Sequence, residues 1–356
     1  RCVILVKETY FMTLPDLATY DALIVVSFGG PEDPSDVMPF LENVLRGRSV
    51  PRERMLEVAE HYYRFGGKSP INDQNRELMR ALKKEFSVRG PDLSVYWGNR
   101  NWHPFLSDTF RSMAADGVRR ALAFTTSAYS SYSSCRQYLD DIERARGEVG
   151  PSAPTVDKIR TFFNHEGFIR PMVENTVCAL HDFPSSKRDE VMLVFTAHSI
   201  PLSMAATSNY VEQLEEASRL VAEGAGHSKW CLVYQSRSGS PTQPWLGPDI
   251  CDYLRELQGA GTSPGVVVVP IGFVSDHMEV IYDLDTEART LCDELDFQMI
   301  RVATVGTHPL FIEMIRSLVL ERVEPDRKRI ALGNLGPSPD ICHTDCCPNP
   351  RHIVNC

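Results

Sequence analysis

The sequence predicts an α/β protein with two doubly wound, Rossmann-like domains, each a parallel sheet covered by helices, and with a cleft between the domains. Short apolar runs rich in β-branched residues alternate with amphipathic helical segments along most of the chain, which is the pattern of parallel sheets. The alternation stops at the polar, proline-containing stretch 182–189 and then begins again. The length of 356 residues is enough for two domains of ordinary size.

The first half begins with the strand 22–27, ALIVVS, which ends at the tight turn 28–31, FGGP. A second glycine pair at 66–67 precedes a helix that Ser69 or Asn72 would cap. The other expected elements of this half are strands at 94–97 and 120–125 and helices at 35–45, 52–63, 73–86, 104–115, 132–146 and 165–183.

The second half begins with the strand 191–196, which ends at 197–201, AHSIP. The four valines 266–269 predict a strand buried on both faces. Asp276 would then cap a helix that starts at His277. The other expected elements are strands at 230–235 and 300–303 and helices at 209–223, 248–257 and 309–322.

These elements divide the chain into three parts. We expect an N-terminal α/β domain at 20–184, a C-terminal α/β domain at 185–323 that carries the catalytic groups, and a C-terminal extension at 324–356. The extension contains proline, glycine and a group of cysteines. Residues 1–11 are excluded from the fold because Met12 is a more natural start.

The composition argues against several classes of protein. A hydrophobic content of 43% and a charged content of 24% are typical of a globular protein. The net charge of −10 argues against a nucleic-acid partner, and no apolar run reaches the 18 residues of a membrane span. Cysteines scattered through a chain of this length indicate reduced thiols. We therefore expect a cytoplasmic protein, as a monomer or a homodimer.

Three carboxylates form a ladder on the helix that follows the strand 266–269. Glu279, Asp283 and Glu287 are spaced four residues apart, so they share one helix face. Like charges at this spacing destabilise a helix slightly, and the ladder starts near the carboxyl end of a strand, where open α/β sheets bind ligands. The ladder is therefore either a solvated acidic face or a cation site.

His198 also lies at the carboxyl end of a strand. Its ordinary pKa suits proton transfer near neutrality, although a single histidine is often structural. The segment 234–248 then mixes glycine, proline and Trp245. It predicts either an ordinary surface loop or a rigid wall for a flat apolar ligand.

Five segments give the chain a resemblance to the ferrochelatases, which insert ferrous iron into a porphyrin. They are SFGGPED at 27–33, FGGKSPIN at 65–72, TAHSIP at 196–201, YQSRSGSPTQPWLGPD at 234–249 and PIGFVSDHMEVIYDLD at 270–285. The last three are highly specific, and the resemblance covers about residues 22–322. The FGGPE form of the first motif and the cysteine tail are most similar to the actinobacterial branch, whose members resemble coproporphyrin III ferrochelatases.

The resemblance implies a chelatase-like fold in which His198 and Glu279 face each other across the metal site of the porphyrin. Metallation must remove two pyrrole N–H protons and deliver a desolvated Fe(II). A neutral imidazole can accept a proton or bind iron, and a carboxylate can bind the cation. Which of the two residues takes which role stays open. Asp283 and Glu287 would complete the metal-binding set as a cation or proton path from solvent.

The expected porphyrin contacts lie in the first two motifs, in the segment LRGRS at 45–49, at the start of the helix 132–146 and in the tryptophan loop. Arginine and hydroxyl donors suit propionates, although the two arginines could equally belong to a solvated helix end. Some relatives place a tyrosine at position 28, where it can ligate iron in the product, and phenylalanine cannot do so. The candidates are Phe28, Arg46, Arg48, Ser69, Tyr132 and Trp245.

The tail CHTDCCPNP predicts an iron–sulfur cluster, most simply [2Fe–2S]. Such a cluster needs four thiolates, and the tail supplies Cys342, Cys346 and Cys347. We expect Cys135 as the fourth ligand, because relatives with a cluster pair one internal cysteine with three near the C-terminus. Two alternatives are Cys356 in place of one of the adjacent pair, and a zinc site.

The expected reaction is insertion of Fe(II) into coproporphyrin III to form coproheme in heme biosynthesis. Coproporphyrin III carries four propionates and is a soluble substrate, which fits a chain without a membrane span. Protoporphyrin IX is the alternative substrate. The rival functions are a non-catalytic porphyrin or heme carrier and a cobalt chelatase.

Overall fold

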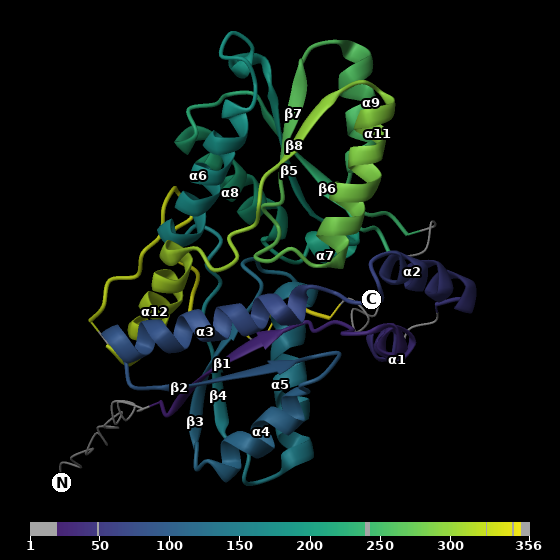
Figure 1. Ribbon diagram of the computed structural model, residues 1–356. Helices are drawn as coiled ribbons and strands as arrows, with labels where there is room; N and C mark the ends of the chain where they lie inside the picture. Colours follow the sequence, from purple (N-terminus) through teal and green to yellow (C-terminus); the bar gives the residue numbers. More distant parts are fainter. Residues whose placement is uncertain (1–19, 48–49, 239–242, 325, 344, 350–356) are drawn as a thin grey trace, which may run out of the picture.

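A computed structural model describes residues 20–47, 50–238, 243–324, 326–343 and 345–349. It contains two four-stranded sheets whose paired strands are all parallel (Figure 1). The strand order is β2-β1-β3-β4 in the first sheet and β6-β5-β7-β8 in the second, so both halves have the same topology. The strands are β1 Ala22–Ser27, β2 Ser94–Asn99, β3 Arg120–Thr125, β4 Thr155–Lys158, β5 Met192–His198, β6 Trp230–Gln235, β7 Gly265–Val269 and β8 Gln298–Arg301.

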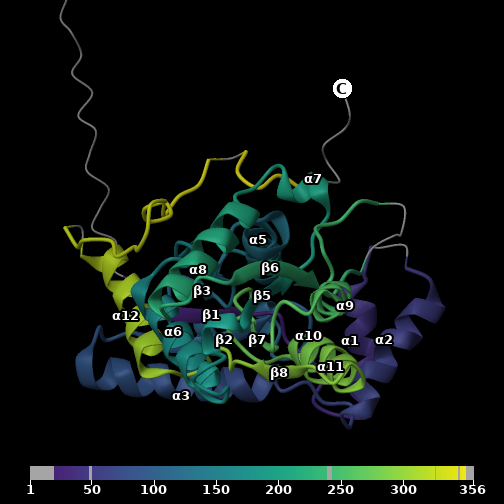
Figure 2. The same ribbon diagram turned by 90° about the horizontal axis from the view of Figure 1, so that it is seen from above.

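The apolar runs form the strands because both of their faces are covered. All residues of β1 and β7 are buried, as expected for inner strands of a parallel sheet. On the second sheet, Val266 and Val268 pack in the cluster with α9 and α11, whereas Val267 and Val269 pack with α6 and α8. The two helix pairs accordingly lie on opposite faces of this sheet (Figures 1 and 2). The predicted fold class is confirmed.

Most helices differ from the predicted segments by a few residues at their ends. The sequence TVDK of strand β4 was not assigned to any element, since two of its four residues are charged, and the one-turn α7 was also missed. The helices are α1 Val37–Val44, α2 Arg52–Arg64, α3 Ile71–Arg89, α4 Leu106–Ala115, α5 Gln137–Val149, α6 Glu166–His181, α7 Leu202–Ala205, α8 Tyr210–Gly224, α9 Ile250–Ala260, α10 Met278–Val280, α11 Arg289–Glu294 and α12 Pro309–Val323.

Two predicted helix caps are wrong. Pro70 is the N-cap of α3, and no side chain caps that helix, because Ser69 and Asn72 are buried and Asn72 bonds elsewhere. His277 is the N-cap of α10, since the Asp276 carboxylate pairs with Arg301. In both cases a long-range partner competes successfully for the side chain expected at the cap.

The segment that carries the carboxylate ladder is not one regular α-helix. Between α10 and α11 lies η4, Ile281–Ala288, which is π-helical. The wider turn requires i→i+5 hydrogen bonds, an arrangement that is uncommon and often found at functional sites. A second π-helical segment, η2 Tyr132–Arg136, precedes α5 and contains Cys135.

The two halves share a hydrophobic core. One cluster of buried side chains contains Leu23 and Val25 of β1 together with Val267 and Val269 of β7. The helix α6, which precedes the expected boundary, packs on α8 and α12, and α12 packs on α3 of the first half (Figure 1). The domain limits at 184 and 323 therefore remain a proposal. Among the residues described, none of the helices combines the length and apolar character needed to cross a membrane.

Candidate active site

His198 and Glu279 come together from separate strands of the second sheet. His198 is the last residue of β5, and Glu279 lies on α10, which follows β7, the neighbour of β5. The distance between His198 Nε2 and Glu279 Oε1 is 3.6 Å. Their side chains remain 30% and 47% exposed, so both atoms are accessible to a ligand although the surrounding core is buried.

The ring orientation of His198 is fixed by its neighbours. Nδ1 lies 2.5 Å from the Ser199 carbonyl oxygen, and the Tyr210 hydroxyl donates to the His198 carbonyl at 3.0 Å. A carbonyl only accepts hydrogen bonds, so Nδ1 carries the proton in the neutral ring. The lone pair of the neutral imidazole is therefore on Nε2, the atom that faces Glu279.

The two groups shift each other's pKa in opposite directions. Burial would lower the pKa of His198, but the negative charge of Glu279 and their hydrogen bond raise it above its ordinary value. Burial would raise the pKa of Glu279, but the positive charge of the protonated His198 ring, its hydrogen bond and the charge of His277 lower it to about 2. Glu279 is thus an anion at every physiological pH, and His198 is a stronger base than free imidazole.

Asp283, the next carboxylate of the ladder, differs from Glu279 in the direction of its pKa shift. Burial, followed by the charges of Glu279 and Glu287, raises the pKa of Asp283 to about 7, although a hydrogen bond from the Ser236 hydroxyl opposes this shift. Gln235 Nε2 lies 3.1 Å from the Glu279 carbonyl oxygen and 3.3 Å from Asp283 Oδ2. Asp283 therefore changes charge near neutrality.

The outermost carboxylate, Glu287, is exposed. Burial and the charge of Asp249 raise its pKa, while Arg54 and Arg64 oppose the shift. The ladder thus runs from an exposed carboxylate to a half-buried one and then to the His198–Glu279 pair. Within the described ranges, no group of three or more His, Cys, Asp or Glu side chains is arranged to hold a metal ion.

Three polar residues of this site were not singled out from the sequence. His277 is half-buried, and burial lowers its pKa although the charge of Glu279 opposes the shift. Gln235 and Ser236 bond to Asp283. All three lie inside the motifs SDHME and YQSR, so the motif was the available signal, but their contacts depend on the packing of η4 against the end of β6.

The tryptophan loop lies against the strand end that carries His198. Trp245 forms a bridge with Pro201, and the Ser199 hydroxyl donates to the Leu246 carbonyl at 2.8 Å. Trp245 is half-buried, and its buried Nε1 has no hydrogen-bond partner. The loop is therefore fixed near the candidate site, and residues 239–242 of it lie outside the described residues.

The other candidate porphyrin contacts are spread over the first half. Phe28 is 36% exposed and packs against Phe40, with the Arg100 guanidinium above its ring. Arg46 is exposed and bonds to Asn43, whereas Ser69 is buried against Gly30, where an added Cβ would collide with it. Arg48 lies outside the described residues.

The first half also contacts the ladder segment directly. The Tyr129 hydroxyl donates to the Ile271 carbonyl at 2.8 Å, just after β7. The ring of His61 on α2 stacks on Tyr282, with centroids 3.6 Å apart and an angle of 9° between the planes. Loops at the carboxyl ends of the two sheets therefore meet at the candidate site.

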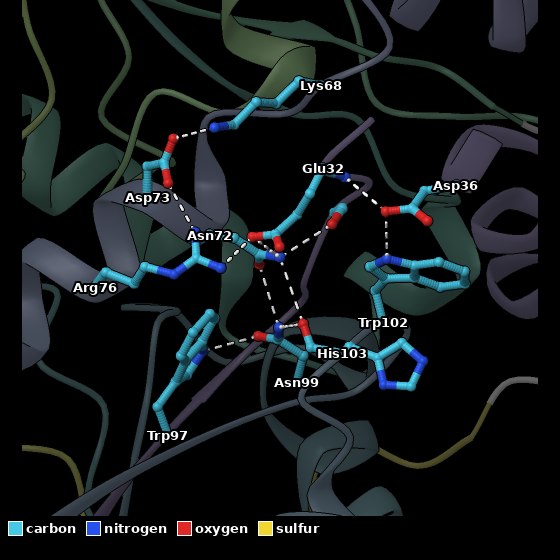
Figure 3. Close-up of polar contacts among 11 residues, drawn as sticks. Glu32, Asp36, Lys68, Asn72, Asp73, Arg76, Trp97, Asn99, Trp102 and His103 are labelled. Carbon is cyan, nitrogen blue, oxygen red and sulfur yellow. Dashed lines mark hydrogen bonds and ion pairs between the residues drawn. The ribbon is translucent and has the colours of Figure 1, made fainter. Parts of the chain in front are cut away.

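At the carboxyl end of the first sheet lies a polar network instead of a reactive pair (Figure 3). Asn72 Nδ2 lies 3.1 Å from the Gly30 carbonyl oxygen, and Asn99 Nδ2 donates to Asn72 Oδ1 at 3.2 Å. Arg76 pairs with Glu32 and Asp73. The network fixes the turn after β1 to the start of α3.

The tail cysteines lie close enough to Cys135 of η2 to interact with it electrostatically, but the four thiols do not form a ready metal site in the described part of the chain. Cys135 and Cys347 are buried, and the sulfurs of Cys346 and Cys347 are 3.7 Å apart. Burial and the neighbouring Cys346 and Cys135 raise the pKa of Cys342 to about 11, and burial and the same groups raise the pKa of Cys347 further. The tail thus lies near Cys135, and the shared cluster expected from the sequence stays a prediction.

Comparison with solved structures identifies the fold. SirB from Bacillus subtilis, solved with Fe³⁺, superposes with a TM-score of 0.53 at 10% identity, over 86% of this chain and 96% of that one. The sirohydrochlorin chelatase SirB from Bacillus subtilis subspecies spizizenii, solved with cobalt, gives a TM-score of 0.50 at 11% identity, over 86% and 97%. The fold is that of the chelatases.

Comparison of sequences identifies the family, which comparison of folds does not. The ferrochelatase family matches residues 20–323. A ferrochelatase from Rhodopirellula baltica is 55% identical over 94% of this chain and 95% of that protein. A coproporphyrin III ferrochelatase from Streptomyces coelicolor is 52% identical over 94% of each. The chain belongs to the ferrochelatase family, and it is an enzyme of the metal-chelatase class of lyases.

Proposed function

We propose that the protein inserts Fe(II) into coproporphyrin III and forms coproheme, a step of heme biosynthesis. The observation that carries this proposal is the His198–Glu279 pair, a base and an anion 3.6 Å apart at the carboxyl ends of two adjacent strands. Metallation needs a proton acceptor and an anionic cation ligand at one place, and this pair supplies both.

The tautomer of His198 supports His198 as the proton acceptor and Glu279 as the iron ligand. Because Nδ1–H donates to the Ser199 carbonyl, Nε2 of the neutral ring is free to accept a pyrrole proton. The imidazolium that forms lies next to the Glu279 carboxylate, which stabilises its charge. Glu279, which stays ionised, is then the first protein ligand of the arriving Fe(II). The cation replaces two pyrrole protons in the macrocycle, and His198 accepts them one at a time, releasing the first to solvent before it takes the second.

The ladder supports a path for iron toward this pair. Glu287 is exposed and offers the cation its first carboxylate, Asp283 follows, and Glu279 faces the porphyrin. Because the pKa of Asp283 is about 7, this carboxylate can also take a proton as iron moves on. The same group therefore suits both inward movement of a cation and outward movement of a proton.

The relatives support coproporphyrin III as the porphyrin. Those from Streptomyces coelicolor and Mycolicibacterium smegmatis are named coproporphyrin III ferrochelatases, and the second is 48% identical over 85% of this chain and 90% of that protein.

We place the reaction in the cytoplasm, where a reducing medium keeps Fe(II) and the thiols reduced. The protein acts as a monomer or a homodimer, with Phe28, Arg46, Arg48, Ser69, Tyr132 and Trp245 around the porphyrin.

An anaerobic absorbance assay tests both the reaction and the substrate. Purified protein is mixed with Fe(II) or Co(II) and with coproporphyrin III or protoporphyrin IX, and kcat/KM is measured for each combination. We expect the highest value for Fe(II) with coproporphyrin III. A higher kcat/KM for protoporphyrin IX would make that porphyrin the substrate, a higher value for Co(II) would indicate a cobalt chelatase, and tight porphyrin binding without turnover would indicate a carrier.

We further propose that Cys135, Cys342, Cys346 and Cys347 hold a [2Fe–2S] cluster. Neither the family match nor the names of the relatives mention a cluster, so the proposal rests on the four thiols. Cys135 interacts electrostatically with Cys342 and Cys347 although more than 200 residues separate them, and a cluster of this type takes four thiolates. Binding of the cluster would have to draw the four sulfurs together, because they do not form a metal site in the described residues. When bound, it would supply a redox-active cross-link between the tail and the body.

Several polar contacts outside the thiols hold the tail in this position. Arg160 forms a buried ion pair with Glu321 and donates to the Ile330 carbonyl. Asn164 Nδ2 donates to the Leu332 carbonyl at 3.1 Å, and Asn349 Nδ2 donates to the Tyr132 hydroxyl at 2.9 Å. These contacts bring the cysteine segment to Cys135 before any metal binds.

Metal analysis of anaerobically purified protein tests the cluster. We expect the visible absorption of a [2Fe–2S] centre and about two irons and two sulfides per chain, by the stoichiometry of the cluster. Cys135→Ser should abolish both and lower the melting temperature. Colourless protein that contains one zinc per chain would show that the thiols hold zinc and no cluster. A Cys135→Ser protein that is still coloured would show that Cys356 or another thiol is the fourth ligand.

A further inference from the structure

Gln74 connects the first half of the chain to the start of the carboxylate ladder. It lies in the first turn of α3, and its side-chain amide contacts both backbone groups of Asp276, 202 residues away. Nε2 donates to the Asp276 carbonyl at 2.5 Å, and Oε1 accepts from the Asp276 N–H at 2.9 Å. One amide thus fixes the plane of two peptide groups in the other half.

The helix that carries Gln74 is itself held in place. Its first turn contains Asn72 and Asp73, which belong to the polar network of the first sheet (Figure 3). Arg76, one half-turn further on, pairs with Glu32 in the loop after β1. Gln74 therefore projects from a backbone that is tied to the first sheet, and it can act as a fixed reference point for the second half.

Asp276 is also fixed through its side chain. Arg301 donates from Nη1 to Asp276 Oδ1 at 3.0 Å, and it binds Asp285 through two hydrogen bonds of 2.7 Å. Asp276 lies two residues before α10 and three residues before Glu279. Gln74 thus holds the backbone of Asp276, and Arg301 holds its side chain. Together they set the direction of α10 after β7.

We propose that Gln74 is a positioning residue for metallation, which sets the place of Glu279 relative to His198 by fixing the Asp276 peptide groups. The inference rests on the function proposed above and adds to it a contribution of the first half to the metal site. The Glu279 side chain is 47% exposed and faces His198 at 3.6 Å, so its position depends mainly on the backbone of α10. A displacement of about 1 Å at a reacting group can cost about 100-fold in rate.

Two substitutions of Gln74 separate hydrogen bonding from packing. Gln74→Met keeps the length of the side chain and removes both hydrogen bonds, and Gln74→Glu keeps an acceptor but sets a carboxylate oxygen against the Asp276 carbonyl. We expect both to lower kcat/KM for Fe(II) about 10- to 100-fold. KM for the porphyrin should stay within about twofold, because the residues expected to contact it are not moved.

Arg89→Met is the matched control. Arg89 lies at the other end of α3 and pairs with Glu313 of α12 at 3.4 Å, so its loss weakens the docking of the same helix without touching Asp276. It should change the melting temperature as much as Gln74→Met does and leave both KM values unchanged.

The outcomes are distinguishable. A fall in kcat/KM for Fe(II) that is confined to the two Gln74 variants, with KM for the porphyrin unchanged, supports the inference. Equal changes in both KM values, or a loss of thermal stability alone, would overturn it, because either result marks a structural contact. If the wild-type protein metallates and Gln74→Met matches it, this inference fails alone; if the wild-type protein does not metallate, the proposed function fails with it.

Discussion

The carboxyl ends of the two sheets share one topology and differ in how their polar groups are used. In the first half, Asn72 and Asn99 are fully buried and bond to each other and to nearby carbonyls (Figure 3). In the second half, His198 and Glu279 face each other at 3.6 Å and keep 30% and 47% of their side chains exposed. The first arrangement leaves few polar groups for a ligand, and the second leaves a lone pair and a carboxylate accessible.

This difference shows how one repeated architecture can supply both a rigid support and a reactive site. Neutral amides bonded to backbone carbonyls fix loops without creating charge. A histidine and a carboxylate held close together instead shift each other's pKa and retain affinity for protons and cations. The contact of Gln74 with Asp276 joins the support to the site. Substitutions of the buried first-half amides should therefore act mainly on stability, and substitutions of the His198–Glu279 pair mainly on activity.

The largest loss of activity is expected from His198→Ala. The variant removes Nε2, the proposed acceptor of the pyrrole protons, and general-base catalysis contributes about 10²- to 10⁴-fold. Turnover of coproporphyrin III with Fe(II) should fall by that factor, while circular dichroism and the melting temperature stay close to wild type. A variant that metallates at nearly the wild-type rate would show that His198 is not the base.

Glu279→Gln should be the next most severe change. The amide keeps the shape of the side chain but removes the negative charge that binds Fe(II) and stabilises the imidazolium, so we expect a loss of about 100-fold in kcat/KM for Fe(II). The pKa of His198 should fall in this variant, because the Glu279 charge is what raises it, and NMR titration of the imidazole measures this directly. An unchanged His198 pKa would contradict the pairing of the two groups.

Substitutions further along the ladder should have smaller effects that depend on pH. Burial raises the pKa of Asp283 to about 7, so this group is neutral below that pH and anionic above it. In the wild type, kcat/KM at low Fe(II) should rise as pH increases through about 7, and Asp283→Asn should remove part of that rise and lower the value a few-fold at pH 8. Glu287→Gln should cost less, about twofold, because exposed charges interact weakly. Equal and negligible effects of all three ladder substitutions would mean that the ladder is a solvated acidic face.

The smallest effect on chemistry is expected from the first-half network. Asn72→Ala leaves buried partners of Asn72 without hydrogen bonds, which costs about 2 kcal/mol of unfolding free energy. Urea denaturation should show this loss, while KM for Fe(II) in the folded protein stays within about twofold. A variant with full stability but a large rise in KM for Fe(II) would show that the network belongs to the active site. The two halves would then not differ in the way described above.

The sequence alone was sufficient for the sheets and for the central pair. Runs such as 22–27 and 266–269 are too apolar and too β-branched to be stable except as covered strands. Among the described residues, seven of the eight strands begin and end within two residues of their predicted ends. Parallel strands bring their carboxyl ends to one edge, so a histidine after one strand and a carboxylate after the next were expected to meet. The motifs that contain His198 and Glu279 pointed to the same pair.

Tertiary structure determined the features that depend on contacts between residues distant in the sequence. Strand β4 forms from TVDK because β3 offers an open edge, and the cap role expected of Asp276 is lost to Arg301. The pKa of Asp283 near 7 arises from burial between β6 and η4, and the spacing of the ladder by itself carries no such information. The contact of Gln74 with Asp276 spans 202 residues, and no local pattern encodes it, since the free energy of such a contact exists only after both halves have packed.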